Sequence, residues 1–504
     1  MFRIDGVQVM LAEIEVAQEI VEFGRLVLVT AGGVMIAILS TKLTDRLRVP
    51  APALFLLAAV LAAELSEPVR GFLSVRDVER IATVALILIL FDGGMHVGWG
   101  RFKAAGVPIG LLGIAGTFAT AGLLAVAAHY LFGFDWIIAW IIGAALAPTD
   151  PAVMFSVLGN REVRGRSGTI LQGESGTNDP VAIALMVGLI EFATSDAGTV
   201  VMIVEEFLIE MAIGLALGLV GGFALRPLMQ RVPLPNEGFY ALRTLAAAGL
   251  IYAAAAVAGG SGFLAVFIAG VLVGDITAPY KVRIARFHDS LAGLSEIVVF
   301  VTLGLTIDLS MLGIDGLWVQ GLVLALILAI AARPLVAGLL LLPARLRPGE
   351  RLFIMWSGLK GAVPIVLGAF VLLGDVPGGE AVYGIVFVVV AFSVIFQGIS
   401  VPSAARRLGV PMEEIAHHPW DAGLRFQHAP RSIHRFEVSE RSPATGRTIR
   451  SLPLGDELWI SLLIRDGRPV QAQGDEVLRP GDEVVALGDL DDVSVARALF
   501  EPPD

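Results

Sequence analysis

Long apolar segments alternate with short polar ones along the chain as far as residue 404. A helix needs about 20 mostly apolar residues to cross a bilayer. Runs of that kind lie near residues 24–41, 51–65, 81–97, 106–130, 136–158, 168–194, 203–230, 239–258, 262–275, 291–307, 316–342, 351–373 and 380–403. After a short N-terminal segment (1–23), the pattern therefore predicts an all-α polytopic membrane domain over residues 24–404, with about thirteen transmembrane helices.

The pattern changes after residue 404. Residues 405–431 hold prolines and histidines between polar residues, which is typical of a linker. In residues 432–504, FEVSE and LWISLLI have the composition of strands, and RDGR is a β-hairpin signal. SPATGRTIRSL (residues 442–452) predicts a helix with Ser442 as its N-cap. We expect a small α/β domain whose modest core favours dimerisation.

Composition supports this division. The 504-residue chain is 56% hydrophobic and 16% charged, whereas soluble domains average about a quarter charged residues. It has no cysteine, which excludes disulfides, thiolate metal sites and a cysteine nucleophile. The net charge of −11 comes without a basic run, so no nucleic-acid partner is expected. Its glycine-rich stretches lack the lysine of a phosphate-binding loop, and no cofactor is expected.

Basic residues concentrate in alternate loops. The basic loops hold Lys42, Arg46, Arg48, Arg101, Lys103, Arg161, Arg164, Arg166, Arg226, Arg231, Lys281, Arg283, Arg286, Arg345, Arg347, Arg406 and Arg407. The other loops hold none, except for Arg70, Arg76 and Arg80. By the positive-inside rule the basic loops are cytoplasmic. We therefore expect a multi-pass protein of the cell inner membrane, in contact with its lipids, with the N-terminus outside and the C-terminal domain in the cytosol.

Polar residues interrupt the sixth apolar run at GESGTNDP (residues 173–180). A charged side chain at mid-bilayer costs at least about 2.5–3.5 kcal/mol, so it needs a partner, a cavity or a function. At 100° per residue, a single helical face of about 140° holds two carboxylates, an amide and a hydroxyl. These side chains are Glu174, Ser175, Asn178 and Asp179.

Proline interrupts the fifth run at APTDP (residues 147–151). Pro148 and Pro151 bracket Thr149 and Asp150, and Pro151 has no N–H to donate to the Ala147 carbonyl. We expect a broken helix with free carbonyl groups, since irregular backbone at membrane depth lines a cavity or is buried in protein.

A second interruption lies in the twelfth run, at SGLKGAVP (residues 357–364). Two breaks at corresponding places indicate inverted six-helix repeats, spans 1–6 and 8–13 around a seventh, whose breaks cross near the midplane. Lys360 would then offset opposed half-helix ends or a carboxylate.

These motifs resemble those of the cation–proton antiporter superfamily. APTDP, ESGTNDP and GLKGAVP occur in the same order, and the Asn-Asp pair is similar to that of the electroneutral NhaP-like branch. FDGG (residues 91–94) resembles a third-span motif in which the acidic residue is often Glu. Residues 432–504 resemble a TrkA-C (RCK C-terminal) regulatory domain, a combination similar to bacterial cell-volume-regulation K⁺/H⁺ antiporters.

The resemblance implies a role for each polar residue of the breaks. Asp179 binds either a proton or the cation, K⁺ or Na⁺. Thr149, Asp150 and Ser175 supply further oxygen atoms to that monovalent cation or order the site. Asn178 holds the broken fifth helix or reaches the third-span carboxylate.

Three further ionisable residues support the site in this resemblance. Glu174 pairs with Lys360, where the family commonly has Arg. Asp92 is the third-span carboxylate. Glu296, in the apolar run SEIVVFVTLG, is a possible structural partner.

The resemblance also implies a transporter rather than an enzyme. A homodimer would exchange cations for protons electroneutrally by alternating access, with a six-helix bundle that holds both breaks moving against a dimerising scaffold. Proton and cation compete for Asp179 because cation binding requires the carboxylate form. The choice among K⁺, Na⁺ and Li⁺ stays open, and so does the ligand of the C-terminal domain.

Two alternatives remain. The first is a cation channel or a K⁺ uptake transporter gated by the C-terminal domain, although the chain has no T-V-G-Y-G-type filter sequence. The second is an intramembrane serine protease, because residues 173–176 match G-x-S-G with Ser175 as nucleophile. Such a protease needs a histidine base, and His96, His129 and His288 lie near predicted span ends.

Overall fold

The computed structural model describes most of the chain in two compact units, Met1–Ile415 and Ala416–Asp504, and each is presented by itself. The described residues are 50–65, 73–150, 161–163, 165–195, 199–313, 316–414, 432–454 and 458–488, with isolated positions at 21, 24, 32, 33, 35, 39, 153, 154, 158, 499 and 500. The predicted first span and the predicted linker fall almost wholly outside them.

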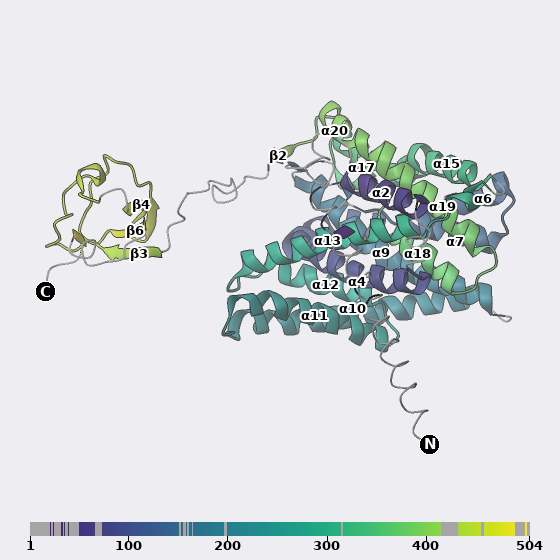
Figure 1. The fold of residues 1–504 in the computed structure, drawn as a ribbon, viewed down its shortest axis with the longest axis horizontal. Helices are drawn as coiled ribbons and strands as arrows, with labels where there is room; N and C mark the ends of the chain where they lie inside the picture. Colours follow the sequence, from purple (N-terminus) through teal and green to yellow (C-terminus); the bar gives the residue numbers. More distant parts are fainter. Residues whose placement is uncertain are drawn as a thin grey trace, which may run out of the picture. The chain divides into compact units, whose positions relative to one another are not determined.

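The first unit is helical and forms one bundle (Figure 1). Its first half comprises α2 (Ala51–Leu65), α4 (Val75–Val97), α5 (Trp99–Gly110), a π-helical turn (Leu111–Gly116), α6 (Thr117–Phe132), α7 (Trp136–Leu146), α9 (Gly165–Thr194) and α10 (Val200–Arg231). Its second half comprises α11 (Glu237–Val257), α12 (Gly262–Gly274), α13 (Lys281–Thr306), α14 (Leu309–Leu312), α15 (Leu317–Ile327), α16 (Arg333–Leu340), α17 (Pro348–Trp356), α18 (Ala362–Leu373), α19 (Gly379–Phe392) and α20 (Gly398–Arg407). Short strands β1 (Arg161–Val163) and β2 (Met412–Glu414) pair antiparallel.

Apolar helices of membrane-spanning length confirm the multi-pass prediction. Seven helical stretches among the described residues are long and apolar enough to cross a bilayer, and α2, α7, α12 and α18 are shorter apolar helices. Every predicted run from 51–65 onward overlaps one of the described helices. α15 continues through a π-helical turn (Leu328–Ala332) into α16, and α19 continues through another (Ser393–Gln397) into α20.

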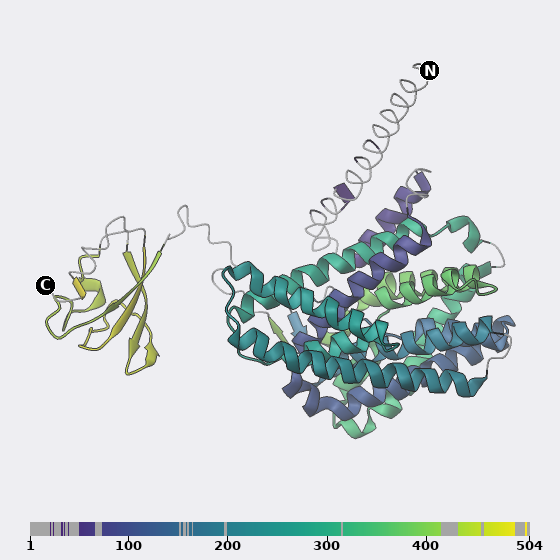
Figure 2. The same cartoon turned by 90° about the horizontal axis from the view of Figure 1, so that it is seen from below.

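Two groups of helices pack against each other in this unit. In the first, called the scaffold here, α12 packs on α4, α10 and α11, and α13 packs on α4 and α2. In the second, the core bundle, α7 packs on α6 and α9, and α19 packs on α15 and α18. Figure 2 shows the same helices turned by 90°. Glycine allows a close approach of two scaffold helices, because a Cβ atom at Gly270 of α12 would strike the Phe91 carbonyl oxygen of α4.

The second unit contains a four-stranded antiparallel sheet in the order β3-β6-β4-β5. The strands are β3 (Ser432–Glu437), β4 (Leu458–Arg465), β5 (Arg468–Val470) and β6 (Glu483–Gly488). Its core includes Phe436, Ile460, Leu463, Val484 and Phe500. The sheet confirms the strand-containing C-terminal region expected from the sequence.

The predicted hairpin is present, but the predicted helix is not. Arg465 pairs with Arg468, and Asp466 and Gly467 both have positive φ angles, as a tight hairpin turn requires. Residues 442–452 instead form turns and a short 3-10 helix (Ile449–Ser451), and Thr448 bridges to Val477. Gly446 has a φ of 78°, which ends any helical continuation.

An ion pair joins β4 to the turn before β6. The Arg465 guanidinium donates from Nε to Asp482 Oδ1 at 2.8 Å and from Nη2 to Oδ2 at 2.9 Å. It also donates from Nη1 to Glu476 Oε1 at 2.9 Å. Burial raises the pKa of Asp482, but hydrogen bonds from Arg465 and from the Arg479 N–H outweigh it and hold this pKa below its ordinary value.

Asp482→Asn is expected to lower the local free energy of unfolding of this sheet by about 1.5–3 kcal/mol at pH 7, because the charged hydrogen bonds are lost. A depressed carboxyl pKa stabilises the fold above the unfolded value of about 3.9, and that stability is lost as the pH falls through the folded value. Hydrogen exchange of β4 and β6 amides in the full-length chain measures the difference, which should disappear in acid. Asp475→Asn, at an exposed residue 3.7 Å from Arg450, is the matched control and should change little.

Candidate functional site

Two interrupted helices meet in the core bundle, as the sequence predicts. α7 ends at Leu146 and the chain is non-helical from Pro148 to Asp150. α17 ends at Trp356 and α18 begins only at Ala362. The Asp150 N–H donates to the Leu359 carbonyl oxygen at 2.8 Å. The two breaks therefore cross in direct backbone contact.

Lys360 neutralises the carboxyl end of the first half-helix. Its Nζ atom donates to the carbonyl oxygens of Ala147 at 2.9 Å and Pro148 at 2.7 Å, and the residue is 1% exposed. The Ala147 carbonyl is the one that Pro151 leaves without a helical donor. A positive charge at a helix C-terminus also opposes the helix dipole. Of the two roles expected for Lys360, the observed hydrogen bonds correspond to the one at the half-helix end.

Asp150 occupies the reciprocal position at the start of α18. Its Oδ2 atom accepts a hydrogen bond from the Ala362 N–H at 3.2 Å, and the residue is 8% exposed. A carboxylate at a helix N-terminus is stabilised by the free N–H groups there. Gly361 permits the approach, because a Cβ atom at that position would overlap the Asp150 carboxylate. The crossing thus places one cation and one carboxylate at opposed half-helix ends.

The polar face of α9 lies against the first break. Asn178 Nδ2 donates to Thr149 Oγ1 at 2.8 Å, so the amide holds the broken helix, one of the two roles expected for it. Ser175 Oγ donates to Asp179 Oδ2 at 3.4 Å. Asp179 is 5% exposed, and the charges that act on it are Asp150, Lys360 and Glu174. The helix face predicted from spacing therefore lies beside the first break.

Two buried oxygen atoms of this face have no hydrogen-bond partner within the described part of the chain. They are Asp179 Oδ1 and Asn178 Oδ1. The Ser175 hydroxyl bonds the Asp179 carboxylate, and the Thr149 hydroxyl bonds the Asn178 side chain, so all four oxygen atoms belong to this pair of neighbouring residues and their partners. Monovalent cations prefer oxygen ligands of this kind, and broken helices beside a carboxylate supply them in transporters.

The expected pair of Glu174 with Lys360 is wrong. Glu174 pairs with Arg333 at the start of α16: Arg333 Nη1 bonds Glu174 Oε1, and Nη2 donates to Oε2 at 2.9 Å. Both residues are buried, at 1% and 6% exposed. The planar guanidinium matches a carboxylate in a two-pronged contact that a lysine cannot make. Arg333 could have been noticed, since it is an ionisable residue inside the apolar run 316–342.

A further polar network, absent from the sequence predictions, supports the second break. The Lys360 N–H donates to Ser393 Oγ at 2.9 Å, and Ser393 Oγ donates to Gln397 Oε1 at 3.1 Å. Gln397 Nε2 donates to the Trp356 carbonyl oxygen, at the end of α17, at 2.7 Å. Ser393 and Gln397 begin and end the π-helical turn that joins α19 to α20. A π-helical turn rotates the side chains that follow it away from the positions of a regular α-helix. The sequence gives no indication of this rotation.

Asp92 of α4 pairs with His96, one turn later in the same helix. His96 Nδ1 lies 3.2 Å from Asp92 Oδ2, and Oδ1 is buried without a partner among the described residues. The alternative that Asn178 reaches Asp92 therefore lacks support from the observed hydrogen bonds. Asp92, His96 and Asp289 could present ligand atoms within 4.8 Å of one another, but acidic groups near the surface often do so without a metal.

Glu296 of α13 shows no ion pair with the other residues that the structure describes. Its Oε1 atom is buried without a hydrogen-bond partner within the described residues, and Asp150 is the charge that acts on it.

No histidine serves Ser175 among the residues that the structure describes. His96 bonds Asp92, and His129 Nδ1 lies 2.7 Å from the Phe134 carbonyl oxygen. His288 Nε2 lies 2.7 Å from Thr244 Oγ1. The serine hydroxyl is bonded to a carboxylate instead, an arrangement that suits ion ligation and not nucleophilic attack.

Two family profiles and several sequence relatives match this chain. The profile of the family described as "Sodium/hydrogen exchanger, transmembrane" matches residues 33–407, and the TrkA-C domain profile matches residues 433–501. A K⁺/H⁺ antiporter NhaP of Alkalimonas amylolytica is 32% identical over 92% of this chain and 82% of its own length. A K⁺/H⁺ antiporter NhaP2 of Shewanella sp. (strain ANA-3) is 31% identical over 92% of this chain and 81% of its own.

The fold has a solved counterpart. The sodium proton antiporter MjNhaP1 from Methanocaldococcus jannaschii superimposes with a TM-score of 0.64 at 22% identity, covering 75% of this chain and 97% of that chain. The membrane unit therefore has the fold of that protein.

Proposed function

Because the chain belongs to the sodium/hydrogen exchanger family, and is therefore a cation/proton antiporter and not an enzyme, we propose that it exchanges K⁺ for H⁺ across the cell inner membrane. The preference for K⁺ over Na⁺ is supported by relatives named K⁺/H⁺ antiporters over nearly the whole chain, TrkA-C domain included. The channel alternative has no such support.

The observation that carries the proposal is the buried cluster around Asp179. Its carboxylate can hold a proton or face a cation. The Ser175 hydroxyl bonds this carboxylate, and the Thr149 hydroxyl bonds the neighbouring Asn178. Only the ionised carboxylate attracts a cation, so one ion displaces the other. The empty, charged site is costly to move through the bilayer, which couples the two flows.

One-for-one exchange follows from Asn178. Its amide cannot take up a proton at physiological pH, and its N–H group is already committed to Thr149. Asp150 and Lys360 are likewise engaged with half-helix ends. Asp179 is then the one group on this α9 face that binds a proton in one step and a monovalent cation in another. The exchange cycle therefore moves no net charge across the membrane.

The crossing moves as part of the core bundle in this proposal. Its half-helices are fastened to one another by Lys360 and Asp150, so they travel together. The scaffold would remain fixed and form a homodimer, with the N-terminus outside and the C-terminal domain in the cytosol, as the basic loops indicate.

The purified protein in liposomes tests the proposal. An imposed K⁺ gradient is expected to change the lumen pH, Na⁺ and Li⁺ should do so less effectively, and clamping the membrane potential to different values should leave the rate unchanged. Ion flux far above transporter rates and indifferent to a pH gradient would instead support a channel.

A further inference from the structure

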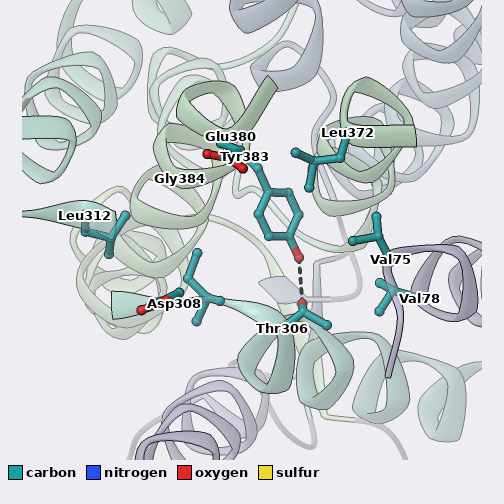
Figure 3. Close-up of a pocket in the computed structure, with 10 residues that line it drawn as sticks. Val75, Val78, Thr306, Asp308, Leu312, Leu372, Glu380, Tyr383 and Gly384 are labelled. Carbon is teal, nitrogen blue, oxygen red and sulfur yellow. Dashed lines mark hydrogen bonds between the residues drawn. The ribbon is translucent and has the colours of Figure 1, made fainter. Parts of the chain in front are cut away.

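A cavity of about 290 Å³ lies between the scaffold and the core bundle (Figure 3). Its scaffold wall comes from the start of α4, the end of α13 and the segment after α13. Its core wall comes from the end of α18 and the start of α19. The lining is apolar apart from Thr306, Asp308, Glu380 and Tyr383. Asp179 and the helix breaks do not contribute to it.

One hydrogen bond crosses this cavity from one helix group to the other. Tyr383 Oη of α19 lies 2.8 Å from Thr306 Oγ1 of α13 (Figure 3). The Thr306 hydroxyl also donates to the Thr302 carbonyl oxygen at 3.0 Å. A hydroxyl group has one proton, so Tyr383 donates across the cavity whenever the Thr306 proton is directed to its own helix.

The tyrosine belongs firmly to the core bundle. Its ring lies against Gly368 of α18, where an added Cβ atom would come within 2.9 Å of the ring, and Tyr383 is only 7% exposed. Thr306 ends the last turn of a scaffold helix. A movement of the core bundle against the scaffold at this end must therefore stretch or break the bond.

Two carboxylates stand at the same cavity. Glu380, in the first turn of α19, is exposed, and Asp308 follows α13 and is partly exposed. Asp308 Oδ1 is held by the N–H and the hydroxyl of Ser310, at 2.9 and 2.6 Å. Carboxylates at the mouth of a low-dielectric cavity raise the local concentration of cations.

We propose that this cavity is the outer vestibule through which a hydrated monovalent cation reaches the transport site, and that the Tyr383–Thr306 bond is the latch that holds the two helix groups together across it. The inference rests on the proposed function, because the orientation given there places the ends of α13 and α18 and the start of α19 outside. Tyr383 and Thr306 act in this proposal by positioning the two helix groups, and they do not ligate the ion.

Cysteine labelling tests the latch. The chain has no cysteine, so Leu372→Cys in the cavity wall gives a unique thiol without further changes. Adding Tyr383→Phe is expected to raise its modification rate by an impermeant maleimide from outside roughly two- to tenfold, the effect of one lost hydrogen bond on an equilibrium. Thr306→Val should do the same. Val200→Cys, at the exposed start of α10, is the control and should be modified at one rate in both backgrounds.

The result separates the latch from the transport function. Labelling requires no exchange activity, so it decides the matter even if the protein fails to exchange ions. Equal labelling of Leu372→Cys with and without the latch variants, or labelling only from the cytoplasmic face, would overturn the proposal.

Transport at low external K⁺ tests the two carboxylates. Glu380→Gln is expected to raise the external K⁺ concentration for half-maximal exchange severalfold at low ionic strength, while the internal value stays unchanged. Added choline chloride should remove the difference, since about 1 M salt shortens the screening length to roughly 3 Å. Glu205→Gln, an exposed glutamate of α10 outside the cavity, is the matched control. An unchanged external value in Glu380→Gln would contradict the vestibule.

Discussion

Asp179→Asn is expected to reduce cation-driven pH change in proteoliposomes to the level of protein-free vesicles. Asparagine keeps the size of the side chain, but it neither takes up a proton nor offers a negative charge to a cation. The Ser175 hydroxyl can still bond the amide oxygen, so the helix face should remain intact. Because both ions lose the same binding group, exchange should fail in both directions and at every pH.

Asp375→Asn provides the matched control for this experiment. It makes the same chemical change at an exposed residue after α18 that has a φ of 49°, a conformation that asparagine adopts readily. Its exchange rate should equal that of the wild type. If Asp179→Asn exchanged ions as fast as this control, the carboxylate would not be the shared binding group.

Arg333→Met is expected to lower the free energy of unfolding by about 3–5 kcal/mol. The substitution leaves the Glu174 carboxylate buried and unpaired, and an uncompensated buried charge is strongly destabilising. The Arg333 fork also donates to the Ile354 carbonyl oxygen, at 3.4 Å, so α9, α16 and α17 are all affected. Unfolding by SDS titration in detergent micelles measures the loss.

A double-mutant cycle isolates the pair. Glu174→Gln combined with Arg333→Met removes both charges and should recover most of the stability lost in the single arginine variant. Arg333→Lys should be intermediate, because an ammonium group cannot make the two-pronged contact. Additive losses in the double variant would show that the two side chains do not stabilise the fold as a pair.

Much of the membrane unit could be predicted because the bilayer restricts the chain so strongly. Apolar length located the described helices. The prolines of APTDP located the first break, and the interruption SGLKGAVP located the second. Helical spacing brought Asn178 and Asp179 to one face beside Thr149. These inferences depend on local geometry, which the sequence contains directly. The first span, 24–41, was predicted in the same way and lies almost entirely outside the described residues.

Partnerships across long sequence distances were less accessible. Glu174 could pair with either of two buried basic residues, Lys360 or Arg333, and the family resemblance implied the lysine. The fold decides between them, because the fork of Arg333 fits the carboxylate while Lys360 is needed at the carbonyl groups of α7. Ser393 and Gln397 were missed since a single hydroxyl or amide in an apolar run does not reveal which backbone group it will meet.

In the C-terminal unit, too, local structure could be predicted but contacts between distant residues could not. The hairpin at Asp466 and Gly467 follows from local turn chemistry and was predicted. Residues 442–452 begin with a good N-cap, yet they form turns, because Thr448 pairs with Val477 and Gly446 takes a positive φ angle. Tertiary pairing overrode the local preference.

The hydrogen bond from Lys360 to the Ala147 carbonyl oxygen also imposes an order on the folding of the newly made chain. The ammonium group that satisfies the Ala147 carbonyl comes from a residue 213 positions later in the chain. At about 5–20 residues per second a ribosome takes roughly 10–40 s to add that length. Through that interval the nascent first half holds bare carbonyl groups inside the translocation machinery or the bilayer, where water or another chain must satisfy them. The first half is therefore a dependent folding unit, completed only when the second half is inserted beside it.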